Sequence, residues 1–258
     1  MPELIDTHCH LDDDRFDDDR DALIARARIS GVSQIVIPAT TAERWKKIQQ
    51  ITQQYSGVYA AYGLHPMFIL QHQEKHLNEL DGWLDQEEVV AVGECGLDFF
   101  KGYQDQQSQL EFFKAQLDIA QNHQLPVIIH ARKSLDLVLR EIRRHTSLRG
   151  VIHSFSGSMQ QAQQLFDLGI KLGIAATISY ERANKLRQIV RDIDIEALVI
   201  ESDAPDQPGQ QHRGERNEPA YIRQHLSVIA ELKNTEEDIL ASKLLENSRK
   251  LFEMSPFK

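Results

Sequence analysis

The sequence predicts an α/β protein, and specifically a (β/α)8 barrel. Eight short segments are rich in β-branched and other apolar residues, and most read as continuous apolar runs. Such runs are typical of parallel strands that are buried on both faces. Helical patterns separate these segments, as expected where strands and helices alternate along a chain. An open doubly wound sheet is the alternative, because periodicity does not show whether a sheet closes on itself.

The expected elements follow one another along the whole chain. The strand-like segments are residues 4–7, 34–39, 58–63, 89–93, 126–129, 150–152, 171–175 and 198–200. The clearest helical patterns are residues 20–29, 109–120, 162–168, 186–193 and 221–232. No proline- or glycine-rich linker and no internal repeat interrupts the alternation, so we expect residues 1–258 to form a single domain.

Composition excludes several classes of protein. With 41% hydrophobic and 26% charged residues, the 258-residue chain has the composition of a globular protein, without a membrane span or a signal peptide. Two cysteines, Cys9 and Cys95, argue against a disulfide framework, so we expect a reducing cytoplasm. The formal net charge of −10 is unlike that of a protein that coats nucleic acid, although bound metal and local cations can still hold a phosphate.

Histidine and acidic side chains stand at the carboxyl ends of five expected strands. His8 and His10 are two positions apart, so on a strand both side chains point to the same face, toward the barrel axis. Burying Glu94 after residues 89–93 is costly unless a cation or hydrogen bonds compensate. Because a barrel gathers these strand ends at one face, we expect the whole set to meet there. The set is His8, His10, Glu94, His130, His153 and Asp203.

Each of these residues has an ordinary explanation when it is taken alone. A His-x-His pair is often incidental, a buried histidine is often hydrogen-bonded within a core, and a carboxylate often pairs with lysine or caps a loop. Their joint position at strand ends favours a common role. Imidazole nitrogens with carboxylate oxygens suit Zn, Mn, Fe or Co, and Mg less readily. We therefore predict two divalent metal ions, with Glu94 bridging them and Asp203 also accepting a proton from water.

Longer motifs surround these residues in a fixed order. They are residues 6–12 (DTHCHLD), 63–66 (GLHP), 93–98 (GECGLD), 130–132 (HAR), 153–157 (HSFSG), 201–205 (ESDAP), 216–219 (RNEP) and Asn247. Together they resemble the motifs of the TatD family of metal-dependent hydrolases, within the amidohydrolase-like barrels. The resemblance runs from Ile5 to about Phe252 and implies a TIM barrel with a binuclear site. By position, one ion would be held by His8, His10, Glu94 and Asp203, and the other by Glu94, His130 and His153.

The same resemblance bears on the substrate. Members of the family are associated with metal-dependent DNase activity, some of them removing nucleotides from the 3′ end, and others are linked to D-aminoacyl-tRNA deacylation. DNA is therefore the expected partner, and the acidic composition favours a small or single-stranded substrate over duplex. No membrane or obligate protein partner is expected. The sequence departs from the commoner family pattern at Asp206-Gln207, where a Tyr-Leu pair is frequent, and this difference bears on substrate preference.

Basic residues near the strand ends are candidates for binding phosphate. His65 ends the third strand, and it either contacts a phosphate or leaving group or caps a turn. Arg132 lies two residues beyond His130. Arg213 and Arg216 lie in the loop after the eighth strand, a frequent phosphate-binding region of this fold, and arginine suits phosphate oxygens. We take His65, Arg132 and Arg216 as the substrate-binding candidates, since Arg213 fits a solvated loop equally well.

Three further features have simpler explanations. Asn217 followed by Pro219 fits the start of a helix. Phe99 and Tyr103 follow the fourth strand and could stack on a base, but core packing is the better interpretation. The acidic run of residues 12–19 (DDDRFDDD) suits a solvated loop that leads into the acidic first turn of a helix, rather than a separate cation site.

Three functions from different classes are consistent with this site. The first is a phosphodiesterase acting on DNA, in which a metal-activated water attacks phosphorus in line and Asp203 serves as base. The second is a hydrolase of carboxylic esters or amides, such as an aminoacyl ester on tRNA or a small lactone. The third is a binding or scaffold protein that keeps metal for stability. The complete ligand set favours an enzyme, and the family resemblance favours the phosphodiesterase.

Overall fold

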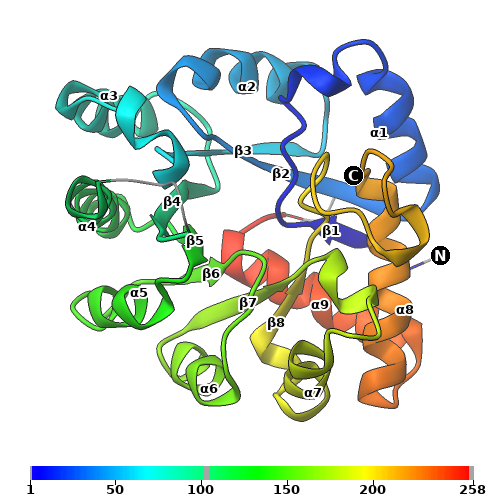
Figure 1. Cartoon of the computed structure of the whole chain (residues 1–258). Helices are drawn as coiled ribbons and strands as arrows, with labels where there is room; N and C mark the ends of the chain where they lie inside the picture. The colour runs from blue at the N-terminus through cyan, green and yellow to red at the C-terminus, as the bar shows by residue number, and fades with distance from the viewer. Residues whose placement is uncertain (1, 101–104, 256–258) are drawn as a thin grey trace.

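Eight parallel strands form a nearly closed barrel with helices around it (Figure 1). The computed structural model describes residues 2–100 and 105–255. The strands are ordered β1 to β8, and each neighbouring pair in that order is parallel. They are β1 (Leu4–Asp6), β2 (Val32–Pro38), β3 (Val58–Tyr62), β4 (Ala91–Asp98), β5 (Val127–Arg132), β6 (Gly150–Ile152), β7 (Ile170–Ile174) and β8 (Leu198–Ile200). The predicted barrel is confirmed, and the open doubly wound sheet is excluded.

The seam between the first and last strands is joined just beyond their carboxyl ends. The Thr7 N–H donates to the Ile200 carbonyl at 3.2 Å, and the Asp203 N–H donates to the His8 carbonyl at 2.9 Å. One step further, the His10 N–H donates to the Ala204 carbonyl at 2.8 Å. These bonds bring the segment after β1 beside the segment after β8, although nearly the whole chain lies between them.

Helices cover the outer face of the strands and one end of the barrel (Figure 1). The α-helices are α1 (Arg20–Ile29), α2 (Ala42–Gln54), α3 (Glu74–Leu84), α4 (Gln106–Asn122), α5 (Leu135–Ile142), α6 (Met159–Asp167), α7 (Asn184–Asp192), α8 (Ile222–Lys233) and α9 (Glu237–Phe252). Short 3-10 helices lie at Asp14–Phe16, Pro66–Gln71, Ala176–Ser179, Ile195–Ala197, Gln210–His212 and Pro219–Tyr221. Within the described residues, no helix has both the length and the apolarity that crossing a membrane requires.

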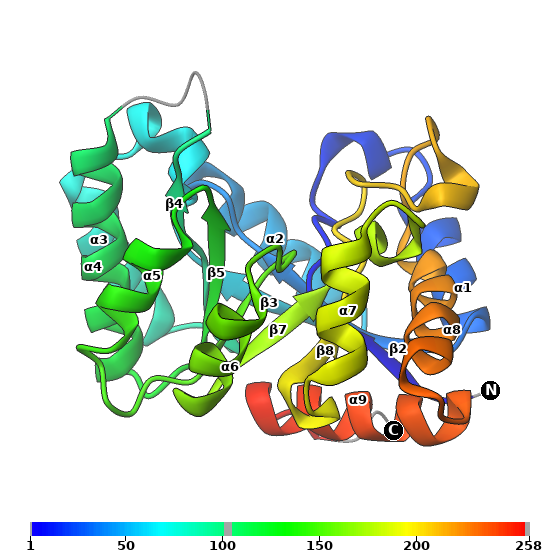
Figure 2. The same cartoon turned by 60° about the horizontal axis from the view of Figure 1, so that its bottom comes forward.

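The barrel interior is apolar at one end only. α9 lies across the bottom of the barrel, below β8 (Figure 2), and contacts both β1 and β8. Its carboxyl end belongs to one apolar cluster with a residue from each of seven strands. These residues are Ile5, Val36, Ala61, Ala91, Ile128, Val151 and Val199, with Leu251, Phe252 and Met254 from the α9 region. Burial of each valine, leucine, isoleucine, phenylalanine or methionine in such a cluster stabilises a fold by about 1.5–3 kcal/mol. Because apolar groups close the bottom, the polar side chains gather at the opposite end, which we call the mouth.

Two glycines make room for polar groups near the mouth. A Cβ at Gly173 in β7 would lie 2.2 Å from Oε2 of Glu201, so a side chain there would displace a fully buried carboxylate. Gly96 in β4 pairs with His130 in β5, and its φ of 135° is one that residues with a side chain rarely adopt. A Cβ at Gly96 would lie 2.0 Å from the His130 carbonyl oxygen. Both glycines therefore allow close packing around the histidines and acids of the site.

His225 in α8 predicts a pH dependence of stability. The side chain is fully buried, its Nδ1 lies 3.2 Å from the Glu201 carbonyl oxygen, and burial lowers its pKa to about 4. Unfolding restores a pKa near 6.5, so the stabilising effect is present above about pH 6.5 and is lost as the pH falls toward 4. The free energy of unfolding should fall on acidification in both proteins. We expect the fall to be smaller in His225→Gln, by up to about 3 kcal/mol.

Urea unfolding of both proteins at pH 7 and pH 4, with a chelator present to remove metal binding, measures this effect. The glutamine can still donate to the Glu201 carbonyl but does not titrate in this range. Equal losses of stability on acidification in the two proteins would contradict the assignment to His225.

Candidate metal centre at the mouth of the barrel

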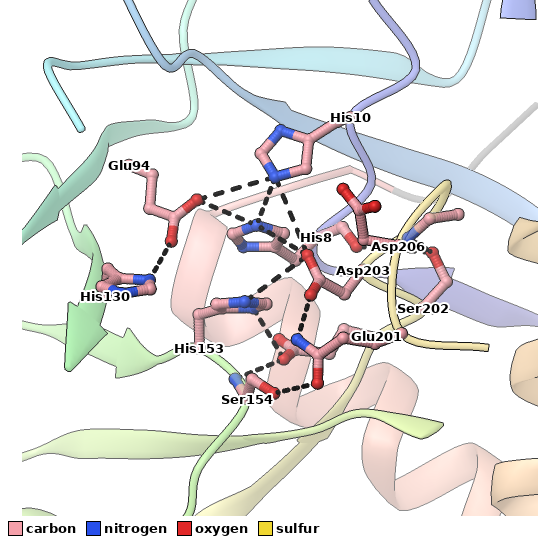
Figure 3. Close-up of polar contacts among 12 residues, drawn as sticks. His8, His10, Glu94, His130, His153, Ser154, Glu201, Ser202, Asp203 and Asp206 are labelled. Carbon is pink, nitrogen blue, oxygen red and sulfur yellow. Dashed lines mark hydrogen bonds and ion pairs between the residues drawn. The ribbon is translucent and has the colours of Figure 1, made fainter. Parts of the chain in front are cut away.

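All six residues predicted from the strand ends meet at the mouth (Figure 3). His8 and His10 follow β1, His153 follows β6 and Asp203 follows β8, whereas Glu94 and His130 lie within β4 and β5. β4 and β5 extend beyond the predicted segments, to Asp98 and Arg132. The prediction that one face of a barrel would gather these side chains therefore agrees with their positions.

Two carboxylates and two histidines converge on one side of the cluster. Nε2 of His8 lies 3.1 Å from Glu94 Oε2 and 3.6 Å from Asp203 Oδ1. Nε2 of His10 lies 3.7 Å from each of the same two oxygens. The two Nε2 atoms are 3.3 Å apart, so both ring nitrogens point into one space together with two acidic oxygens. This donor set fits a divalent ion such as zinc or manganese.

The other oxygen of Glu94 has a different pair of histidine neighbours. Oε1 lies 3.1 Å from Nδ1 of His130 and 3.2 Å from Nε2 of His65. The two oxygens of this fully enclosed carboxylate thus face two separate groups of nitrogens, which is the arrangement expected of a bridging ligand. His65, which the sequence left between phosphate binding and turn capping, is buried here and also accepts from the Met67 N–H.

His153 lies beside the cluster in a different orientation from the one implied by the family resemblance. Its Nε2 is 3.5 Å from Asp203 Oδ1, and its ring stacks on that of His8 with centroids 3.6 Å apart. The His130 and His153 ring centroids are 6.4 Å apart. In this arrangement His65, rather than His153, is the second histidine next to Glu94 Oε1.

Two buried carboxylates that the sequence analysis did not select support the histidines. Oδ2 of Asp98 lies 2.9 Å from Nε2 of His130, and Oε1 of Glu201 lies 2.9 Å from Nδ1 of His153. Glu201 Oε1 also accepts from the Ser154 N–H at 2.6 Å. The hydrogen bond between Asp98 and His130 can orient that imidazole and fix its tautomer, whereas Glu201 lies beside His153 as a charged neighbour without a hydrogen bond to its Nδ1. Spacing in the sequence could have identified both residues. Asp98 is four residues from Glu94, and Glu201 is two from Asp203, so each pair would lie on one face of a strand.

The environment of the cluster keeps its acids ionised and two of its histidines neutral. Burial alone would raise the pKa of Glu94, but His65, His8 and His153 outweigh it and hold that pKa well below the usual range. The pKa of Asp203 is likewise lowered, because His153 and His8 outweigh burial. Burial lowers the pKa of His8, and it lowers the pKa of His65 to about 4. For His153 and His130 burial is outweighed in the opposite direction, because Asp203 and Glu201 raise the pKa of His153 and Asp98 and Glu94 raise that of His130. Since a metal ion binds the neutral imidazole, a cation bound at these two histidines would displace a proton.

A cavity of about 710 Å³ opens from the cluster to the surface. Arg132 lines this cavity, and its guanidinium lies over the Phe100 ring, 3.8 Å from the centroid. Arg216 is not among the residues that line the cavity; it forms a two-bond ion pair with Asp19, at 2.8 and 2.7 Å, and contacts Glu218. The structure thus places Arg132 at the site and Arg216 in a surface network.

The other described residues that were singled out in the sequence lie in a loop, at the surface or against the core. Nδ2 of Asn217 donates to the carbonyls of Ser202 and Asp206 at 2.8 Å each, which fixes the loop after β8. Arg213 is exposed, Phe99 packs partly against the core, and Tyr103 lies outside the described residues. In the acidic run, Asp14 pairs with Arg44 and Lys47, and the run ends at the N-cap of α1.

The loop that departs from the commoner family pattern contacts the cluster directly. Nε2 of Gln207 donates to Asp203 Oδ2, and Ser154 Oγ donates to Gln207 Oε1 at 3.2 Å. Asp206 binds Arg15 through two bonds of 2.9 and 3.0 Å, and Arg15 also binds Asp13. We call the group Asp13, Arg15 and Asp206 the Arg15 clamp.

Gln207→Leu is expected to weaken metal binding by about tenfold, because supporting partners of this kind typically contribute 10- to 100-fold. The change removes the donor to Asp203 Oδ2. Titration with Mn²⁺ or Zn²⁺ measures the affinity. Gln210→Leu is the matched control, since Gln210 is exposed in the same loop, and it should bind metal as the unmodified protein does. Equal affinities in both variants would contradict a supporting role for Gln207.

Comparison with known proteins agrees with this site. A family model described as TatD related DNase matches residues 5–253. The chain belongs to the TatD family. It is 38% identical over 252 residues to the uncharacterized metal-dependent hydrolase YjjV of Escherichia coli (strain K12), covering 96% of this chain and 97% of the relative. A crystal structure of the E. coli YjjV superimposes with a TM-score of 0.94 over 98% of each chain.

A second relative carries an activity in its name. The 3'-5' ssDNA/RNA exonuclease TatD of Salmonella typhimurium is 32% identical over 258 residues, covering 97% of this chain and 99% of the relative. The family predicted from the motifs is confirmed, and the chain is a metal-dependent hydrolase of the TatD family.

Proposed function

We propose that this TatD-family hydrolase cleaves phosphodiester bonds of single-stranded nucleic acid at a centre for two divalent metal ions. The observation that carries the proposal is the position of Glu94, whose two oxygens face two different groups of histidines. One ion would be held by His8, His10, Glu94 Oε2 and Asp203 Oδ1. The other would be held by Glu94 Oε1 and His130, with His153 as the third ligand by family resemblance and His65 as the alternative by distance.

The residues of the chain support such a reaction. Ions bound here would activate a water molecule and neutralise the negative charge that develops on the phosphate. Asp203 is ionised and buried at the cavity wall, so it can accept the proton of the attacking water. The hydrogen bond from Gln207 fixes the orientation of its carboxylate. Arg132, exposed at the rim of the cavity, can bind a phosphate oxygen.

Two observations support a single-stranded substrate. The Salmonella relative is named as an exonuclease of single-stranded DNA and RNA, and this chain has a net charge of −10, which disfavours wide contact with duplex. We propose removal of nucleotides from the 3′ end, as in the name of that relative. We also infer that residues 1–258 work as one domain, because the ligands come from strands throughout the chain, and that the enzyme acts in a reducing cytoplasm, since both cysteines are buried free thiols.

Cleavage of single-stranded oligonucleotides labelled at the 3′ or the 5′ end tests this function. Mg²⁺, Mn²⁺ and Zn²⁺ are compared with a chelator control, and the product ladder gives the polarity. Metal content is measured in parallel for His65→Ala and His153→Ala, because the variant that loses the second ion identifies the ligand. No cleavage by folded, metal-loaded protein would contradict the proposal and would favour carboxylic esters or amides, with aminoacyl-tRNA as the next substrate to test.

A further inference from the structure

Cations on the two sides of the mouth differ in their partners. On the side above β8 and β1, Arg15 and Arg216 are both held by carboxylates, whereas Arg213 is exposed but is not among the residues that line the cavities at the mouth. On the side above β5 to β7, four basic side chains are exposed. They are Arg132, Lys133, Arg182 and Lys185. Among the described residues, only Arg132 of these four has a carboxylate within 4.0 Å, namely Asp98 at 3.9 Å.

Exposed basic side chains without a carboxylate within 4.0 Å also occur elsewhere on the described surface, for example Lys46 and Lys75. What distinguishes Lys133, Arg182 and Lys185 is that they line the cavities at the mouth. Cations that remain unpaired beside a cavity create a local positive potential, which attracts anionic ligands even to an acidic protein. The uncompensated positive charge at the mouth therefore lies on the side above β5 to β7.

These cations line a groove that is longer than the metal centre. The central cavity shares Arg132, Ser156 and Lys185 with a neighbouring cavity of about 690 Å³. On its other flank it shares Arg182 and Gln207 with a third cavity of about 520 Å³. The three hollows therefore adjoin one another along these shared residues, and we call them together the groove.

Two aromatic rings lie beside cations in this groove. Phe100 lines the first hollow, is 40% exposed, and lies under the Arg132 guanidinium. Tyr180 lines the third, with the Arg182 guanidinium 5.3 Å from its ring centroid. Rings and guanidinium planes stack on bases of any sequence, while cations follow the phosphates. This combination is typical of surfaces that bind single-stranded nucleic acid.

We propose that Arg132, Lys133, Arg182 and Lys185, with Phe100 and Tyr180, form a track that binds several nucleotides of a single strand beside the metal centre. The inference rests on the proposed function, because the track leads a phosphodiester to that centre. Across the mouth, Asp206 lines the central cavity, and the Arg15 clamp carries two carboxylates against one guanidinium, so this side disfavours the phosphates of a continuing strand. The strand therefore enters over β5 to β7 and ends at the metal centre, which gives the enzyme a preference for a free end.

The test compares two variants that each lack two cations. The track variant is Arg182→Ala with Lys185→Ala, and the control is Lys46→Ala with Lys75→Ala, which removes exposed lysines from α2 and α3. Arg132 is left in place because it is near Asp98, and Lys133 because its φ of 59° suits alanine poorly. Circular dichroism confirms that both variants are folded.

Binding of a fluorescent 12-nucleotide oligo(dT) is measured by anisotropy in a chelator, which stops cleavage and removes the contribution of metal. We expect the track variant to bind about tenfold more weakly at low salt. The slope of log affinity against log salt concentration should become shallower by about 1.4, or about 0.7 for each lost phosphate contact. The control should retain the affinity and the slope of the unmodified protein.

A second measurement separates the track from the proposed function. The ratio of kcat/KM for the 12-mer to kcat/KM for bis(p-nitrophenyl) phosphate should fall about tenfold in the track variant only. If the unmodified enzyme hydrolyses neither substrate, the proposed function is contradicted. The binding measurement would still show whether the track binds a single strand. Three results would overturn the track. They are an unchanged affinity of the track variant for the oligonucleotide, no binding of the oligonucleotide by the unmodified protein, and equally effective displacement of the oligonucleotide by a polyglutamate peptide of the same charge.

Discussion

Asp203→Asn is expected to lower kcat by about a thousandfold, within the range of 10²- to 10⁴-fold typical of a general base. The substitution keeps the size of a side chain whose Oδ1 faces His8, His10 and His153. It removes the negative charge that makes this group a proton acceptor. The measurement is kcat for bis(p-nitrophenyl) phosphate at saturating Mn²⁺, with metal content determined on the same sample.

Asp206→Asn is the matched control for this prediction. Asp206 lies three residues away in the same loop but binds Arg15 rather than the cluster. Its loss removes a surface ion pair, which contributes about 0–1 kcal/mol to stability, and should leave kcat nearly unchanged. Full activity in Asp203→Asn, with the fold and metal content preserved, would rule out Asp203 as the base.

Glu94→Gln is expected to reduce the bound metal from two ions to one or none and to abolish turnover. Both oxygens of this carboxylate lie against histidine nitrogens, with His8 and His10 on one side and His65 and His130 on the other. An amide has one acceptor oxygen and no charge, so it cannot bridge two cations. Elemental analysis after dialysis against limiting Zn²⁺ gives the stoichiometry.

Glu141→Gln separates metal loss from the general cost of changing a buried acid. Glu141 is also fully buried, but it lies in α5 and pairs with Arg140 and Arg144. We expect this variant to lose stability, because two arginines lose their partner, and to retain two ions per chain. Two ions in Glu94→Gln would refute the bridging role.

The metal-ligand candidates could be predicted from the sequence because a barrel strongly constrains where residues at strand ends lie. His130 and His153 each end a continuous apolar run, and parallel strands in a barrel all end at the same face. Polar side chains at those ends have to converge, whatever the details of the helices outside. Hence the candidates could be named without knowing any contact between them.

Side-chain direction outside the strands could not be predicted in this way. Arg216 follows the last strand, where this fold often binds phosphate, yet it turns away to Asp19, which lies 197 positions earlier in the sequence. Arg182 and Lys185 carry no motif, and their interest comes from their position in the cavity wall and from the lack of a carboxylate within 4.0 Å among the described residues. Pairings between distant loops decide such cases, and periodicity does not contain them.

Some helices were also missed for physical reasons. The clear helical patterns did not include α2, α3, α5 or α9. α3 buries only Leu80 and Leu84, and α5 spans only eight residues, so neither has a long apolar repeat. α9 covers the open bottom of the barrel, and it buries Asn247 and Ser248 besides its apolar residues. Its packing partners are the ends of β1 and β8, which no local pattern identifies.

The position of the proposed metal site across the seam between β1 and β8 bears on the order in which the barrel folds and opens. His8 and His10 lie on one side of this seam and Asp203 on the other, with backbone bonds joining segments 193 positions apart. Closing so long a loop is entropically costly, so we expect the chain ends to join last and to separate first. An ion held from both sides would act as a clasp on the finished barrel. Its signature would be slower amide hydrogen exchange at Thr7, His10 and Asp203 after metal is added, with little change between β2 and β3, whose own residues are not among the proposed ligands.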